Sequence, residues 1–343
     1  MDGFFTKIKI SQWSREMVAR LWGFFQHKVP DVRLQTQAHH PYYKPSNVNH
    51  NQATTSGKGI TIAMIDTGIH LHNDVQERIV VFRDFLHGKH VPYDDNGHGT
   101  HCAGCAAGNG CLSQGLYKGP AYEANLAILK VLDEKGAGQA ATVVAAIEWC
   151  IRYKDVYNIR VLSLSFGYVT GGTEVDDPVI QSVEKAWRAG IVVCVSAGNK
   201  GPEMGTISSP GMCPTVITVG ASDTAATHYG EVIVPASYSS RGPTVHGHTK
   251  PDFLLPGTGI ISLRAPYSYL DQRRPIDRVG EAYCVMSGTS MATSRCAGLV
   301  ALLLEKQPEL TPDEIKEKLV QAANDLGYEA TIQGRGYLNF TNL

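Results

Sequence analysis

The sequence predicts an α/β fold in three layers, a mostly parallel, twisted sheet with helices on both faces. The first observation is a series of short apolar runs rich in β-branched residues, as buried parallel strands require. The second is the pattern between these runs, where apolar residues recur every four positions, as on one face of a helix. Strands that alternate with helices indicate parallel strands joined by helical crossovers.

Five apolar runs are the expected strands of this sheet. They span residues 59–65, 126–132, 161–166, 191–197 and 215–221. Functional side chains of parallel sheets gather at the carboxyl ends of the strands, where the following loops meet. We therefore look for chemistry in the residues that follow these runs.

Helices are expected over residues 139–153 and 177–189, where the apolar positions have helical spacing. Gly190 follows the second pattern and suits a helix C-cap, because glycine readily adopts the left-handed conformation. Near the carboxyl end, Thr311 and Glu314 stand three residues apart with a proline directly after the threonine. This is the pattern of a capping box, so a further helix is expected to start there.

The first 56 residues differ from the rest of the chain. Apolar residues from Trp13 to Phe25 recur every four positions, which predicts a helix over residues 11–26. A polar stretch rich in histidine and proline follows and is typical of a linker or an extended segment. We divide the chain into an N-terminal extension, residues 1–56, and an α/β domain, residues 57–343.

Composition and charge exclude several kinds of partner. The 343 residues include 31 Lys and Arg against 32 Asp and Glu, so no basic excess exists to bind a phosphate backbone, and nucleic acid is not an expected partner. No apolar run approaches the ~18 residues of a transmembrane helix, and the N-terminus does not resemble a secretory signal. We expect a cytoplasmic protein without a membrane partner; a chain that begins after a removed signal would look the same.

The eight cysteines allow two interpretations. They form four disulfides, or they are thiols buried in the core. Most of them lie in apolar runs, as Cys150 and Cys194 do, and disulfides are rare in cytosolic proteins. We expect buried thiols.

Three polar residues stand at the ends of expected elements. Asp66 directly follows the first strand, His98 lies near a helix start after a turn, and Ser290 opens an apolar helix behind Gly288. Taken singly, Asp66 is typical of a turn and Ser290 of an N-cap. Taken together, a carboxylate, an imidazole and a hydroxyl at a helix start can serve as orienting group, general base and nucleophile.

The helix after His98 also allows a metal interpretation. His98, His101, Cys102 and Cys105 share one helix face, and all are ligand types for zinc. A single helix cannot surround one ion tetrahedrally with four side chains, since structural zinc sites draw ligand pairs from two segments. Zinc is therefore the weaker alternative.

Asn199 ends another expected strand, and its amide can donate to a developing oxyanion. With it, the motifs DTG, NGHGTHCAG, SAGN and SGTSMA occur in one chain in this order. These motifs resemble those of the subtilisin-like serine proteases, and the resemblance covers about residues 57–340. Because no signal peptide is recognised, the chain is most similar to the intracellular bacterial subtilisins.

The resemblance implies a subtilisin-like fold and a serine endopeptidase that hydrolyses peptide bonds of protein or peptide substrates through an acyl-enzyme. It implies Ser290 as nucleophile, His98 as general base and acid, Asp66 as the group that orients His98, and Asn199 as oxyanion donor. His101 is not carried over, because the first histidine of GHGTH is the base in the family. No cofactor is required for this chemistry.

A structural calcium is the metal that the resemblance implies. Asp74, in the segment LHND, matches an aspartate that ligates calcium in many members. The loop over residues 108–119 falls where other ligands would lie, but its sequence does not resemble the usual ligand loop. Cys102, one helical turn past His98, resembles the thiol of the cysteine-bearing branch and predicts sensitivity to mercurials.

The segments LSFGY and VSAGN resemble the walls of the primary specificity pocket in the family. The implied substrate-binding residues are Ser165, Phe166, Gly167, Tyr168, Ser196 and Gly198. These walls hold no buried acid, which indicates a preference for apolar substrate side chains or a broad preference. The bulk of Tyr168 narrows the range of side chains that fit.

Two features depart from the family pattern. Ser294 stands where a proline usually follows the nucleophile by four residues, and its N–H restores a donor to the Ser290 carbonyl. A displaced nucleophile would weaken hydrolysis and relatively favour acyl transfer to amines, unless neighbouring packing absorbs the change. Residues 1–50 are shorter than a secreted prodomain and serve either as an inhibitory segment that covers the cleft until activation or as a helix packed permanently on the domain.

Two other functions stay open at this point. One is a catalytically silent relative that binds peptides or regulates another protease; the intact motif residues argue against it, and Ser294 leaves it open. The other is a zinc-binding or redox module built on His98–Cys105.

Overall fold

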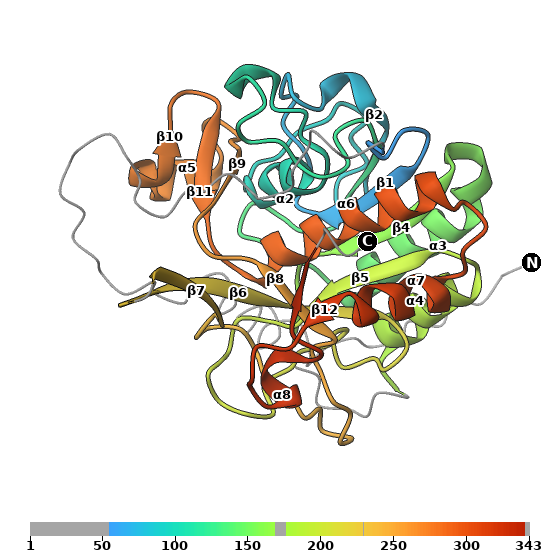
Figure 1. Cartoon of the computed structure of the whole chain (residues 1–343). Coiled ribbons are helices and arrows are strands. Elements are labelled where there is room, and N and C mark those ends of the chain that lie inside the picture. Colours follow the sequence, from blue (N-terminus) through green and yellow to red (C-terminus); the bar gives the residue numbers. More distant parts are fainter. Residues whose placement is uncertain (1–54, 169–175, 229, 340–343) are drawn as a thin grey trace, which may run out of the picture.

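The computed structural model describes residues 55–168, 176–228 and 230–339. The helix predicted over residues 11–26 lies outside this part of the chain. A ten-stranded sheet forms the centre of the described domain, in the order β12-β13-β8-β6-β5-β4-β1-β3-β2, with β7 paired to β6 (Figure 1). A second, three-stranded sheet has the order β10-β11-β9.

The large sheet is mostly parallel. Its parallel strands are β1 (Thr61–Asp66), β2 (Ile79–Asp84), β3 (Asn125–Lys130), β4 (Ile159–Leu164), β5 (Val192–Ser196), β6 (Ile217–Thr227), β8 (Phe253–Pro256) and β13 (Tyr337–Leu338). Two strands pair antiparallel to it, β7 (Gly230–Pro235) and β12 (Ala323–Asn324). The small sheet is antiparallel and consists of β9 (Ile260–Leu263), β10 (Arg278–Val279) and β11 (Tyr283–Met286).

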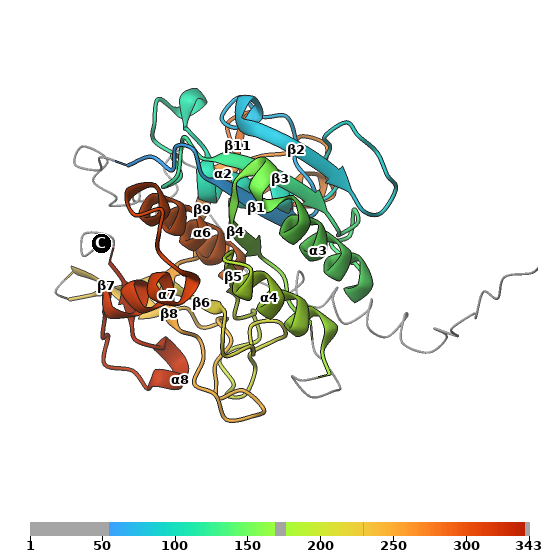
Figure 2. The ribbon, with the colours of Figure 1, turned by 90° about the vertical axis from the view of Figure 1, so that its right-hand side faces the viewer.

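Helices cover both faces of the large sheet. The helices of the described chain are α2 (His98–Ala107), α3 (Ala140–Tyr157), α4 (Pro178–Arg188), α5 (Tyr269–Arg273), α6 (Thr289–Lys306), α7 (Pro312–Gln321) and α8 (Ala330–Gln333), with short 3-10 turns at η1 (Gln76–Arg78), η2 (Cys111–Ser113) and η3 (Pro275–Asp277). Of these, α5 lies beside the small sheet (Figure 1). Figure 2 shows α3 and α4 on one face of the sheet, with α2 and α6 on the other. The predicted three-layer α/β architecture is confirmed.

The central strands are apolar because both faces of the sheet are covered. All six residues of β1 and all five of β5 are buried, as expected for parallel strands between two helix layers. The five predicted strands are all present. β6 continues to Thr227, past its predicted end at residue 221, because its last residues form an antiparallel ribbon with β7.

The predicted helix boundaries depend on capping residues that the structure confirms. Asp177 caps α4 by accepting two backbone N–H groups, and Gly190 follows this helix with a left-handed φ of +86°. At α7, Thr311 and Glu314 make the reciprocal bonds of a capping box. The sequence patterns missed eight strands of the described chain, which are short or partly exposed: β2, β7, β8, β12 and β13 of the large sheet and the three strands of the small sheet.

All eight cysteines lie in the described part of the chain, and all are free thiols. Seven are buried, as expected, and Cys111 is exposed. Among the described residues, the structure shows no helix that is both long and apolar enough to cross a membrane.

Candidate active site

The candidate catalytic residues meet at one edge of the large sheet. Asp66 is the last residue of β1, and Asn199 lies in the loop after β5. Since β4 pairs in parallel with β1 on one side and β5 on the other, the carboxyl ends of these three strands are neighbours. His98 and Ser290 are the first and second residues of α2 and α6, which lie together on one face of the sheet (Figure 2).

Asp66 and His98 form a buried pair. Nδ1 of His98 lies 2.8 and 3.0 Å from the two carboxylate oxygens of Asp66. An ionised carboxylate only accepts hydrogen bonds, so Nδ1 of the neutral imidazole carries the proton and Nε2 keeps its lone pair. This is the tautomer that a general base requires.

The charge of Asp66 also changes the basicity of His98. Burial alone would lower the pKa of His98, because the imidazolium loses solvation. The negative charge of Asp66, its hydrogen bond to His98 and the neighbouring Cys102 sulfur together outweigh this effect, so the pKa of His98 is raised well above its usual value. The pair therefore stabilises the imidazolium that forms when His98 accepts a proton.

Thr67 and Asp94 hold this pair in place. Thr67 donates its backbone N–H to Asp66 (2.7 Å) and its hydroxyl to Asp94 (2.9 Å), and the same hydroxyl oxygen accepts the N–H of Gly99 (2.8 Å). Asp94 also accepts the N–H of Gly97, 2.8 Å away, directly before the first residue of α2. The sequence analysis did not assign Asp94; an aspartate shortly before an Asn-Gly pair is the turn signal that would have found it.

Lys130, at the end of β3, is a second residue that the sequence analysis missed. Its side chain is wholly buried, and Nζ donates to the carbonyl oxygens of Thr67 (2.6 Å) and Leu132 (2.7 Å) and to Asp95 Oδ1 (2.7 Å). One ammonium group thus joins the residue after Asp66 to the loop that precedes α2. A lysine at the end of an apolar run is the corresponding sequence signal.

Ser290 is buried, and its hydroxyl points to the end of β4. Oγ donates to the carbonyl oxygen of Ser165, 2.7 Å away. In this conformation the hydroxyl proton is bound by a backbone carbonyl, so attack on a substrate requires the hydroxyl to turn from Ser165 to His98. A side-chain rotation of this kind is fast compared with turnover.

Asn199 is oriented by the start of α6. Its Oδ1 accepts the backbone N–H of Thr289 (2.9 Å) and the Thr289 hydroxyl (3.0 Å). Because a backbone N–H is always a donor, the atom that faces it is the amide oxygen, and Nδ2 points away from Thr289. Nδ2 then lies beside Gly288, where a Cβ would be 3.3 Å from it. An N–H donor thus lies next to the first turn of the helix that carries Ser290.

Ser294 contributes more than the expected backbone donor. Its hydroxyl is buried and donates to the Ser290 carbonyl oxygen at 2.9 Å, and the Ser165 hydroxyl donates to the same oxygen at 3.1 Å. The two hydroxyl oxygens lie 3.2 Å apart. Two side chains therefore restrain the backbone of Ser290, and a proline at position 294 would remove the Ser294 contact while leaving that of Ser165.

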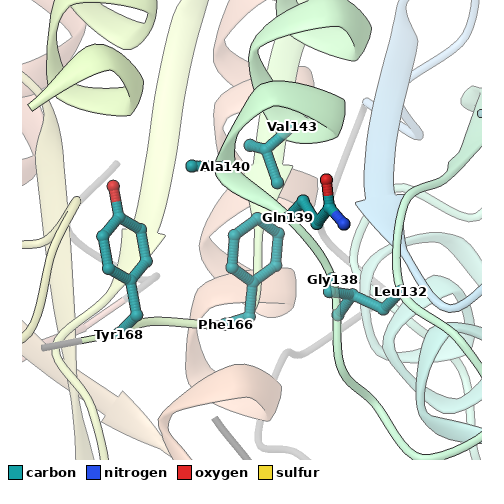
Figure 3. Close-up of a pocket in the computed structure, with 7 residues that line it drawn as sticks. All are labelled: Leu132, Gly138, Gln139, Ala140, Val143, Phe166 and Tyr168. Atoms are coloured by element: carbon teal, nitrogen blue, oxygen red, sulfur yellow. The ribbon is translucent and has the colours of Figure 1, made fainter. Parts of the chain in front are cut away.

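Two of the implied substrate-binding residues line a pocket (Figure 3). Its lining consists of Leu132, Gly138, Gln139, Ala140, Val143, Phe166 and Tyr168. None of these side chains is charged at neutral pH, and the rings of Phe166 and Tyr168 stand side by side in Figure 3. This composition agrees with an apolar preference.

The other implied substrate-binding residues lie elsewhere. Ser165 contacts the backbone of Ser290, and Ser196 is buried beneath the loop, where its hydroxyl donates to the Phe166 carbonyl at 3.1 Å. Gly198 accepts the N–H of Ser240 through its carbonyl oxygen. A Cβ at Gly167 would lie 2.6 Å from the Ser208 hydroxyl, so this glycine permits a close packing of two loops.

The residues around Asp74 do not fit a calcium ion. Calcium takes six to eight oxygen ligands. The buried carboxylate of Asp74 instead accepts from the Tyr283 hydroxyl (2.9 Å), the Cys111 thiol (3.2 Å) and the Leu112 N–H (3.2 Å). Its carbonyl oxygen accepts Nη2 of Arg78 at 2.5 Å. Donors and a guanidinium thus occupy the positions where a cation would need oxygens.

Arg78 bridges three segments in this region. Nη2 also donates to the carbonyl of Ala107 (2.6 Å), and Nη1 donates to that of Ala124 (2.8 Å). The positive charge of Arg78 therefore lies among backbone carbonyls of three segments.

The zinc alternative for the helix α2 is not supported by its side chains. His101 contacts the backbone carbonyls of β9 and β11 through Nε2, and Cys105 lies 3.5 Å from its Nδ1. Burial and the nearby charge of His98 lower the pKa of His101 to about 3, so His101 is neutral. In the described chain, Asp66, His98 and Cys102 are the only group of three or more such side chains whose ligand atoms all lie within 4.8 Å of one another. Cys102 Sγ lies 3.8 Å from both ring nitrogens of His98, as expected for a thiol packed under the base.

Comparison with known proteins gives one family. A family model described as the subtilase family matches residues 57–337. The chain is 50% identical over 298 residues to the serine protease AprX of Bacillus subtilis, a match that covers 85% of this chain and 67% of that protein. It is 31% identical over 286 residues to subtilisin DY of Bacillus licheniformis, covering 82% and 90% of the two chains.

Solved structures agree with this result. A psychrophilic protease, S41, superposes with a TM-score of 0.70 at 27% identity and covers 83% of this chain and 93% of its own. A cold-adapted subtilisin-like serine proteinase gives a TM-score of 0.64 at 28% identity, with 84% and 89% covered.

Asp66→Asn should lower kcat for peptide hydrolysis by ~10⁴-fold, because the amide stabilises the wrong tautomer of His98. It should also move the acidic limb of the kcat/KM profile to lower pH. The charge of Asp66 raises the pKa of His98, and the base works only when deprotonated, so loss of the charge lets His98 deprotonate at lower pH.

The measurement is a pH–rate profile with one fluorogenic peptide. Asp155→Asn, a change at an exposed carboxylate, is the control. An acidic limb that does not move would contradict the role given to Asp66.

Unfolding of the Ser290→Ala protein should be insensitive to chelators, with a Tm that changes by less than about 2 °C in EDTA.

In the same Ser290→Ala background, Arg78→Ala should lower the free energy of unfolding by about 3 kcal/mol, because it leaves buried carbonyls without donors. Arg188→Ala, at an exposed ion pair, is the control and should change it by less than about 0.5 kcal/mol. Thermal and urea unfolding provide both values. A clear loss of Tm in EDTA would show that a metal, not Arg78, holds this region.

Proposed function

We propose, since this chain belongs to the subtilase family and is a serine endopeptidase, that Asp66, His98 and Ser290 form its catalytic triad and that Asn199 is its oxyanion donor. The observation that carries the proposal is the buried contact between Asp66 and Nδ1 of His98, which leaves Nε2 as the base. The position of Ser290 at a helix start, next to the strand ends that carry the pair, supports its role as nucleophile.

The reaction begins when the Ser290 hydroxyl turns from Ser165 to His98. Nε2 of His98 takes the hydroxyl proton as Oγ attacks the carbonyl carbon of the scissile peptide bond. The C–N bond then breaks, the proton passes from His98 to the leaving amine, and an acyl-enzyme remains on Ser290. Water attacks this ester with His98 again as base, which releases the acid and restores the hydroxyl.

The oxyanion formed in each attack needs donors that are already in place. The Nδ2 group of Asn199 and the backbone N–H of Ser290 in the first turn of α6 are the two that we assign. Their orientation is set before the substrate binds, because Thr289 holds the oxygen of the Asn199 amide. Loss of one such donor costs about 10²–10³ in kcat in comparable sites.

We propose an apolar or broad substrate preference, with protein or peptide chains bound along the loop after β4. Phe166 and Tyr168 supply two largely buried aromatic rings to the pocket there. Tyr168 is fixed in this place, because its hydroxyl donates to Asp177 at 2.5 Å and Asp177 also caps α4. The remaining implied residues have a different role, which is to shape the loops beneath the substrate. Their contacts support this role for Ser165, Gly167, Ser196 and Gly198.

We also propose that the N-terminal extension covers the cleft until it is removed or displaced. These residues lie outside the described chain, but the point where they join it is known. The N–H groups of Ser56 and Gly57 each donate to Glu305 at 2.6 Å. Glu305 is near the far end of α6, about 22 Å from Ser290 at ~1.5 Å per residue, a distance that some fifty residues span easily.

A cytoplasmic location is a further proposal, which the eight unpaired thiols support.

A catalytically weakened relative is the alternative function. The hydroxyl of Ser290 is bound to Ser165, and Ser294 restrains the Ser290 carbonyl, both of which favour a less reactive nucleophile. Active-site labelling and substitution of Ser294 separate a full triad from a weakened one.

Purified protein should react with a fluorophosphonate probe at Ser290, and Ser290→Ala should not. Mapping of the labelled peptide by mass spectrometry gives the site. The same reaction is run after deletion of residues 1–54. Labelling that increases on deletion supports an inhibitory extension, whereas equal labelling excludes it. No labelling in either form would contradict an assembled triad.

Ser294→Pro should raise kcat for peptide hydrolysis, by up to ~10²-fold, because it removes both the hydroxyl and the N–H that hold the Ser290 carbonyl. Ser294→Ala is the matched variant, since it removes only the hydroxyl. Steady-state kinetics on one peptide are compared with the Tm of each variant. A Ser294→Pro protein that folds normally and gains no activity would show that neighbouring packing already absorbs the change.

A further inference from the structure

The chain makes an excursion between β9 and β11 that packs against the loop before His98. It contains α5, η3 and β10 and is drawn in orange in Figure 1. The N–H of Tyr269 donates to the carbonyl of Asp95 (2.8 Å), and that of Leu270 to Asn96 (3.0 Å). A Cβ at Gly97 would lie only 2.6 Å from the Ser268 hydroxyl. The excursion therefore contacts the residues immediately before the base.

Tyr267, at the start of this contact, has an unusual backbone. Its φ is +63°, in the left-handed region that bulky L-residues rarely adopt. Both of its peptide groups are nevertheless held. The N–H donates to Asp271 Oδ2 (2.9 Å), and the carbonyl accepts Nε2 of Gln272 (2.6 Å). The conformation is thus imposed by its neighbours.

A cluster of ion pairs holds Asp271, the residue that binds the N–H of Tyr267. Asp271 is buried and accepts hydrogen bonds from Arg264 (2.5 and 3.0 Å) and from Arg278 (2.8 and 3.0 Å). Burial would raise the pKa of Asp271, but these guanidinium bonds outweigh it and hold the pKa at about 2. The carboxylate is therefore charged at neutral pH, where it accepts the N–H of Tyr267.

The ring that this arrangement displays is 84% exposed. The ring of Tyr267 contributes little to the core, and yet Tyr267 keeps its strained backbone conformation. Strained residues that are held by their surroundings are typical of active sites and ligand clamps. A fixed tyrosine offers a large, partly apolar contact surface and loses little conformational entropy on binding.

We propose that Tyr267 is a substrate-binding residue whose ring packs against an apolar side chain of the polypeptide as it passes His98. This inference rests on the proposed function of the site. The occupant is the substrate, because the excursion packs against the loop that directly precedes His98. The contact lies outside the reacting atoms, so it adds binding energy for extended substrates and takes no part in the chemistry.

The test compares two substrates that differ in length. One is an internally quenched peptide of about ten residues with apolar residues on both sides of the cleaved bond. The other is a short peptide p-nitroanilide, which has no residues beyond the cleaved bond. Tyr267→Ala should lower the ratio of the two kcat/KM values about tenfold, mainly through KM of the long peptide. Tyr267→Phe should keep the ratio, because it keeps the ring.

Controls separate binding from structure. Ile276→Ala removes another exposed apolar side chain of the same excursion, 70% exposed, and should leave the ratio unchanged. Tyr267→Gly relieves the left-handed strain. It should lower the ratio of the two kcat/KM values as Tyr267→Ala does, and it should not lower the Tm. Fluorophosphonate labelling of Ser290 in every variant reports whether the triad itself is assembled.

Each outcome decides the inference. A tenfold lower ratio in the Ala and Gly variants, with labelling retained, supports it. An unchanged ratio, or an equal loss for both substrates, would overturn it. A gain of activity on the long peptide in Tyr267→Ala would also overturn it, since the ring would then hold the chain's own extension. Wild-type protein that fails to label at Ser290 would instead contradict the proposed function.

Discussion

The arrangement of the site depends on one close approach of two backbones. A Cβ at Gly99, in the first turn of α2, would lie 2.3 Å from the carbonyl oxygen of Gly68, just after β1. Only glycine permits the helix to come this near to the strand end. Because of it, the imidazole at the start of α2 reaches the carboxylate at the end of β1. That contact in turn compensates the cost of burying a charged Asp66.

The two sides of the candidate site are built by different means. On the side of the triad, backbone groups at the end of β4 and at the start of α6 hold two of the side chains, as Ser165 holds Ser290 and Thr289 holds Asn199. The sheet and the helix that packs on it therefore set their positions. On the outer side, the excursion after β9 has no such frame, and a buried ion cluster around Asp271 supplies the rigidity. The inner side favours fixed geometry for chemistry, whereas the outer side can vary without disturbing it.

Much of the fold was predictable because parallel strands buried on both faces carry continuous apolar runs. β2 was missed because it lies at the edge of the sheet and alternates in exposure, and the small sheet because its strands have two to four residues. The candidate triad could be found from residue types at element ends. Asp94 and Lys130 were not assigned, although each stands in a recognisable pattern, because they act through backbone groups of other segments and no local pattern shows such contacts. The direction of the Ser290 hydroxyl depends on one side-chain rotation, which no sequence pattern records.

Arg78 places a positive charge among backbone carbonyls of three segments, in the region where the family resemblance implied a metal. A bound ion stabilises a protein by mass action, so its contribution grows with the logarithm of its free concentration. A guanidinium that belongs to the chain has no such dependence, because its local concentration is set by the covalent structure. The stability that this one contact contributes is then independent of the ionic supply around the protein.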